Sequence, residues 1–139
     1  LLGLTFFCCK KDVKQSDSSA SEVKISAVDT LSLKLNNGEK WTVNDATKIG
    51  VAKMDSILKA FNSKKEKNYA ELGQNLSAQT SFIIKSCDMT GEAHDQLHVV
   101  LVPMLDEIYE LKDSEDLNEN KNSTKSLEAL VNAYYKHFQ

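Results

Sequence analysis

From residue 44 onward, apolar residues recur every three to four positions, which is the period of an amphipathic helix. The pattern predicts helices over residues 44–61, 67–87, 91–112 and 123–138, with Asn44 as the N-cap of the first. Because most connections are short, neighbouring helices should be antiparallel, and we expect an up-down four-helix bundle over residues 44–139. The inward positions are predicted to be Ala46, Ile49, Met54, Ile57, Leu58, Phe61, Tyr69, Leu72, Leu76, Ile83, Cys87, His94, Leu97, His98, Leu101, Met104, Leu105, Ile108, Leu111, Leu127, Leu130, Val131, Tyr134 and Phe138.

Ahead of the helices, apolar and polar residues alternate, which is the period of a β-strand. The dipeptide Asn37-Gly38 can adopt the positive φ angles of a tight turn, so residues 25–43 are predicted to form a β-hairpin. Two strands alone are marginally stable in water, so the hairpin should pack on the helices. Its inner face is predicted to comprise Leu31, Leu33, Leu35, Trp41 and Val43. The fold class expected is therefore mainly α, with residues 25–139 as one domain.

The chain begins with an apolar run, LLGLTFFCC, followed by a charged, Ser-rich segment over residues 10–24. The run is too short for a transmembrane helix, which needs about 20 residues. It resembles the end of a bacterial lipoprotein signal peptide, in which a cysteine is lipidated after cleavage. Residues 1–9 are thus interpreted as a signal remnant and residues 10–24 as a flexible tether. The resemblance implies an exported protein anchored through Cys9 or, alternatively, Cys8, on the periplasmic side of the envelope or at the cell surface.

Charge and motifs exclude several classes of function. The chain of 139 residues carries a net charge of −3 and has no basic stripe, so nucleic acid is not an expected partner. It also lacks a Gly-rich phosphate loop, a GxSxG elbow and an HExxH motif, so we do not expect an enzyme.

Potential metal ligands are most concentrated in the stretch SCDMTGEAHDQLH, residues 86–98. His94 and His98 are four residues apart and share a helix face, a spacing that lets two imidazoles reach one ion. Cys87 ends the preceding predicted helix, and Met89 lies in the connection. The four side chains therefore predict a metal site at one end of the bundle.

Topology adds further candidates at this end. In an up-down bundle the fourth helix finishes where the second finishes, so His137 is expected nearby as an additional or supporting donor, with Met54 deeper in the first helix. The carboxylates Asp95 and Glu92 are candidates for hydrogen-bonding partners of the ligands.

Thiolate, thioether and imidazole are soft to borderline donors, which favour copper, with zinc as the alternative metal. The predicted role is sequestration or relay of copper in the envelope. The competing interpretation is a lipid-anchored structural or interaction module that binds another envelope protein and uses the polar residues only to finish its helices.

The stretch SCDMTGEAHDQLH also resembles part of a known group of proteins. Together with WTVNDATKIGVAKM and the lipoprotein-like start, it resembles small lipid-anchored helical proteins of bacterial envelopes that contain Cys-x-Met and His-x-x-x-His. The architecture is also similar to cytochrome b562, which holds haem b between a Met of the first helix and a His near the end of the last. That similarity implies Met54 and His137 as haem ligands, without a CxxCH attachment motif.

Overall fold

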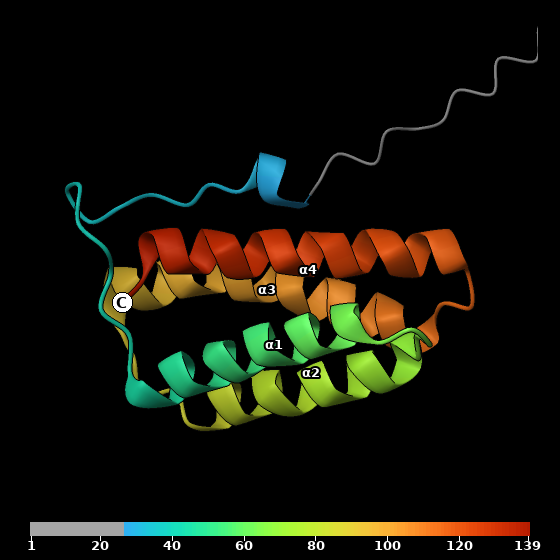
Figure 1. Cartoon of the computed structure of the whole chain (residues 1–139). Coiled ribbons are helices and arrows are strands. Elements are labelled where there is room, and N and C mark those ends of the chain that lie inside the picture. Colours follow the sequence, from blue (N-terminus) through green and yellow to red (C-terminus); the bar gives the residue numbers. More distant parts are fainter. Residues whose placement is uncertain (1–26) are drawn as a thin grey trace, which may run out of the picture.

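The computed structural model describes residues 27–139, and from residue 45 onward this part of the chain forms four helices packed against one another (Figure 1). Successive helices run in opposite directions, and the C-terminus lies at the end of the bundle where α1 begins. The mainly helical fold predicted from the sequence is confirmed. The elements are η1 (Ala27–Thr30), α1 (Asp45–Ser63), α2 (Tyr69–Lys85), α3 (Gly91–Asp113) and α4 (Leu117–His137). The predicted signal remnant, the tether and the first two residues of the predicted hairpin lie outside the described residues.

Side-chain caps begin three of the helices. Asn44 accepts a hydrogen bond from the backbone N–H of Thr47, and Asn68 caps α2 in the same way. Asp116 accepts from the first two residues after Leu117, so α4 begins there and not at Ser123 as predicted. Residues 117–122 therefore form the first turns of α4, and the loop before the helix is limited to residues 114–116.

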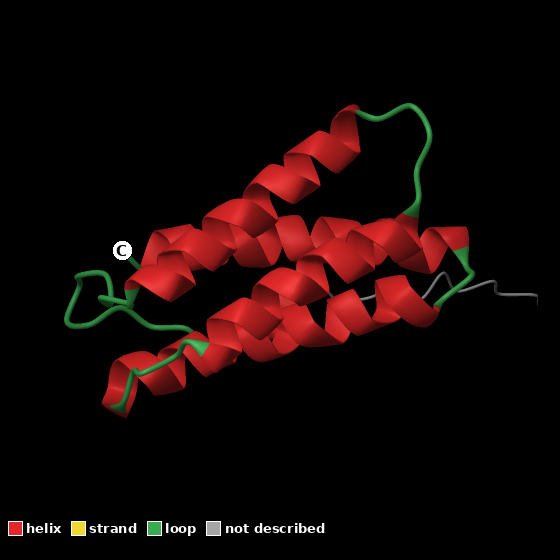
Figure 2. Ribbon diagram, turned by 90° about the horizontal axis from the view of Figure 1, so that it is seen from below, coloured by secondary structure: helices red, strands yellow, loops and turns green. Residues whose placement is uncertain are grey.

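The core lies between the four helices, each of which packs on its neighbours in the chain, while α1 also packs on α4. Most predicted inward positions are buried, but Ile49 is 48% exposed and Leu105 is half-buried. The close approach of α1 to α2 requires Gly50, because a Cβ atom there would lie 2.3 Å from Cγ1 of Ile83. Figure 2 shows these helices from below, joined by loops. The fully buried large side chains are Phe138, Met54, Leu58, Leu76, Ile83, Leu97, Met104, Leu111, Leu127, Leu130, Val51 and Val100.

The segment that precedes α1, residues 31–43, differs from the predicted hairpin, and we call it the strap. Its turn forms as expected: Asn37 and Gly38 have φ angles of 52° and 92°, between bridge partners Asn36 and Glu39. No strands flank this turn in the described residues 27–43, because the flanking backbone groups bond to the helical domain. Leu31 and Leu33 pack against the core, Trp41 and Val43 are buried, and Leu35 is exposed.

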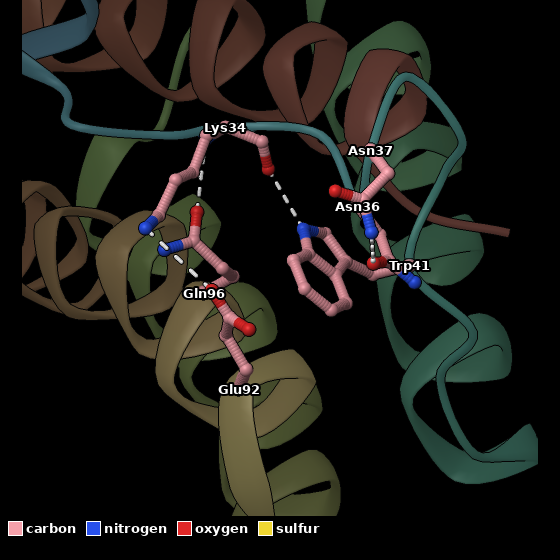
Figure 3. Close-up of polar contacts among 6 residues, drawn as sticks. All are labelled: Lys34, Asn36, Asn37, Trp41, Glu92 and Gln96. Atoms are coloured by element: carbon pink, nitrogen blue, oxygen red, sulfur yellow. Dashed lines mark hydrogen bonds and ion pairs between the residues drawn. The ribbon is translucent and has the colours of Figure 1, made fainter.

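Two sets of contacts fasten the strap. Oε1 of Gln96 on α3 accepts from the backbone N–H of Lys34 at 2.9 Å, and the ammonium of Lys34 lies 3.5 Å from Glu92 (Figure 3). The backbone N–H of Trp41 donates to the carbonyl of His137 at 2.8 Å, and the N–H of Gln139 donates back to Trp41 at 2.9 Å. The strap thus joins the start of α3 to the end of α4.

None of the described helices combines the length and apolar character needed to cross a bilayer.

Candidate metal centre

A surface pocket of about 200 Å³ lies where the end of α2 meets the start of α3. Three of the predicted donors, Cys87, His94 and His98, line it. They come from the loop after α2 and from the first turns of α3, so the tight connection over residues 86–90 brings them together. The remaining lining residues are apolar: Ile83, Ile84, Leu97 and Leu101.

The two histidines are neighbours on consecutive turns of α3. Their ring centroids lie 4.3 Å apart, with 57° between the ring planes. His94 is half-buried and His98 is exposed, so the prediction that both point into the core was wrong. The buried face of α3 is centred near Leu97 and Met104, and at 100° per residue the histidines fall at its edge, facing the seam with α2.

Cys87 is a half-buried free thiol just beyond the C-cap of α2. Its backbone N–H lies 3.4 Å from the carbonyl of Ile84, a long and weak hydrogen bond. The thiol therefore lies in the pocket, at the point where the chain leaves α2 and the regular hydrogen bonding of the helix ends.

The other predicted site residues lie elsewhere. The side chain of Met89 packs against the core, and Met54 is fully buried within it. His137 is half-buried, with Nδ1 2.8 Å from the carbonyl oxygen of Ala133. Glu92 pairs with Lys34, and Asp95 is exposed. None of these five lines the pocket.

Across residues 27–139, no three His, Cys, Asp or Glu side chains are grouped closely enough to hold an ion in the present conformation. The three donors of the pocket would thus have to change rotamers to share one. Such a change is feasible for Cys87 and His98, since neither side chain is enclosed by the core.

One apolar residue of the lining, Ile84, was missed by sequence reasoning. Ile84 is 52% exposed and lies next to the fully buried Ile83, so it falls outside the predicted inward face of α2. In the sequence, an apolar residue outside the predicted inward face was the feature that could have indicated a surface pocket.

No family model, curated protein or solved structure matches this chain. The inference of function depends on the residues of the pocket.

Proposed function

We propose that the pocket lined by Cys87, His94 and His98 binds one copper(I) ion and that the protein sequesters or relays copper. The observation that supports this function is the convergence of a thiol and two neighbouring imidazoles on one pocket at a helix–helix junction. Met89 and His137, which the sequence also suggested, are left out of the proposed ligand set because they do not line that pocket.

The number of donors in the lining favours copper(I) over zinc. Thiolate and imidazole suit both metals, but structural zinc sites almost always have four protein ligands, whereas the donors that line this pocket are Cys87, His94 and His98 alone. Glu92, the carboxylate closest in sequence to His94 apart from Asp95, is paired with Lys34. The other walls are apolar, so they supply no further donors and limit the coordination number.

Haem b, the other cofactor suggested by the sequence, is not part of this proposal. Haem ligation would require the thioether of Met54 to face a cavity large enough for the macrocycle. Met54 is instead fully buried among the side chains of the core.

We also propose that the protein is an exported lipoprotein anchored through Cys9, or alternatively Cys8, with residues 10–24 as its tether. The support is the apolar run that ends at these cysteines and the polar, Ser-rich segment that follows. Changing both cysteines to serine should move the protein from the membrane fraction to the soluble fraction. Persistent membrane association of that double variant would contradict the anchor.

Titration with copper(I) in the presence of a competing chromogenic chelator tests the metal site. The wild-type protein should bind one equivalent under reducing conditions. The variants Cys87→Ser and His94→Ala/His98→Ala should each bind at least about 10-fold more weakly, since even residues that only orient ligands contribute 10- to 100-fold to metal affinity. Equal affinities for the wild type and both variants would overturn the proposal, and preference for zinc(II) over copper(I) would overturn the choice of metal.

The exposed Ile84 at the pocket favours a second candidate, a site for an envelope protein partner. An apolar side chain beside a pocket is the kind of feature that protein partners bury. That function would be favoured if the protein binds no copper and if the variant Ile84→Lys no longer binds an envelope protein that the wild type binds.

A further inference from the structure

The side-chain amide of Asn44 joins the start of α1 to the loop that carries Cys87. Its Oδ1 accepts hydrogen bonds from the backbone N–H of Thr47 at 3.0 Å and from the hydroxyl of Thr47 at 2.6 Å. Its Nδ2 donates to the carbonyl oxygen of Ser86 at 2.9 Å and to Oδ1 of Asp88 at 2.8 Å. Both the acceptor and the donor side of the amide are thus used, and they serve different elements.

The two groups that accept from Asn44 belong to the residues immediately before and after Cys87. The backbone N–H of Cys87 makes only a long hydrogen bond, to the carbonyl of Ile84, among residues 27–139. Met89, two residues after Cys87, packs its side chain on the core. Asn44 therefore supplies the short polar contacts that fix the chain on both sides of the thiol, although it does not itself line the pocket.

We infer that Asn44 is a positioning residue for the Cys87 thiol, which it holds in the pocket opposite His94 and His98 by binding Ser86 and Asp88. This inference rests on the proposed copper site and deepens it. The role of Asn44 as an N-cap was predicted from the sequence. Its contacts to the loop, however, join residues more than forty positions apart, and the sequence does not indicate them.

The substitution Asn44→Asp separates the two roles. Aspartate is as good an N-cap as asparagine, so α1 keeps its start. A carboxylate, however, donates no hydrogen bond, and it would face the carbonyl of Ser86 and the carboxylate of Asp88, which repel it. The matched control is Asn68→Asp, because Asn68 caps α2 through Glu71 and is exposed.

Positioning of the thiol can be measured without metal. We expect iodoacetamide to alkylate Cys87 several-fold faster in Asn44→Asp, with Cys8 and Cys9 replaced by serine in every variant so that one thiol reacts. Asp88→Ala, which leaves the cap intact and removes one of the two contacts, should give a smaller increase. Equal rates in the parent, Asn44→Asp and Asp88→Ala would overturn the inference, whatever the protein does with copper.

A double-mutant cycle tests whether Asn44 acts through the thiol. Asn44→Asp should weaken copper(I) binding by about 10-fold, as expected for a residue that orients a ligand, while Asn68→Asp should leave it unchanged. In the Cys87→Ser background, Asn44→Asp should cause no further loss. An equal loss in both backgrounds would overturn the positioning role, whereas a parent that binds no copper would overturn the proposed function and leave the alkylation result as the measure of positioning.

Discussion

The indole N–H of Trp41 donates a hydrogen bond to the backbone carbonyl of Lys34 at 2.7 Å, across the tight turn of the strap. The backbone N–H of the same Lys34 donates to Gln96 on α3. Trp41 thereby closes the strap on itself and, through Lys34, fastens it to the helix that carries both histidines of the pocket (Figure 3).

Replacing Trp41 with phenylalanine should lower the free energy of unfolding by about 1 kcal/mol or more, because the hydrogen bond is lost and a smaller ring fills the buried site. Urea denaturation followed by circular dichroism measures this change. The matched control Tyr109→Phe removes a hydroxyl from a side chain that is 65% exposed and should have a much smaller effect. A Trp41→Phe protein as stable as the wild type would show that the indole contact is not stabilising.

Gly50→Ala should destabilise the protein by about 1–3 kcal/mol, the usual penalty for overpacking, although alanine is the better helix former by about 1 kcal/mol. The added Cβ would lie 2.3 Å and 2.7 Å from two side-chain carbons of Ile83. The double variant Gly50→Ala/Ile83→Ala should lose less free energy of unfolding than the sum of the two single changes, since the clash disappears. Simple additivity in the thermal or urea data would contradict the packing seen between α1 and α2.

The free energy of unfolding should fall at alkaline pH because of the buried side chain of Tyr134. Burial raises the pKa of Tyr134 above its ordinary value of 10.0, and within the described part of the chain its hydroxyl has no hydrogen-bond partner. Above pH 10 the unfolded tyrosine loses its proton while the folded one keeps it, so the folded state loses stability as pH rises.

Tyr134→Phe should therefore have similar or higher stability near neutral pH, because a buried unpaired hydroxyl is removed, and a shallower decline between pH 9 and pH 11. Urea midpoints across this range give the comparison. Tyr135→Phe is the control, since Tyr135 is 39% exposed and should change the decline less. An unchanged pH profile in Tyr134→Phe would contradict the expected titration.

Met89→Leu should leave copper(I) affinity unchanged. The side chain packs on the core, so a substitution of similar volume preserves its contacts. His137→Ala should likewise have no effect on affinity, because Nδ1 of His137 lies 2.8 Å from a backbone carbonyl of its own helix and the ring does not line the pocket. A 10-fold loss in the Met89→Leu titration would bring the thioether into the ligand set.

Sequence periodicity predicted the helical bundle well because the apolar spacing of each helix is regular. It misplaced the start of α4, since residues such as Asn120 are polar yet buried, and periodicity counts only apolar residues. It also predicted strands from alternation over the strap, where Leu31 and Leu33 pack on helices without a partner strand.

For the candidate site, spacing alone placed Cys87, His94 and His98 at one junction, because a short loop between antiparallel helices leaves few alternatives. It could not determine which side of α3 the imidazoles face. A helical wheel fixes the angle between His98 and Leu101 but not where the buried face ends, and that limit depends on how α2 and α3 pack. The role of Asn44 was likewise invisible, since its partners lie on another helix end.

The pairing of Trp41 with Phe138 has a consequence for the order of folding. Contacts between consecutive helices join segments that are near in sequence, whereas this parallel bridge closes nearly the whole domain into a loop, which carries the largest entropy cost. The bridge can form only when the end of α4 is in place. Since Trp41 is the only tryptophan, its fluorescence should reach the native value after the helical circular dichroism signal has recovered, and it would report when the two ends of the domain have met.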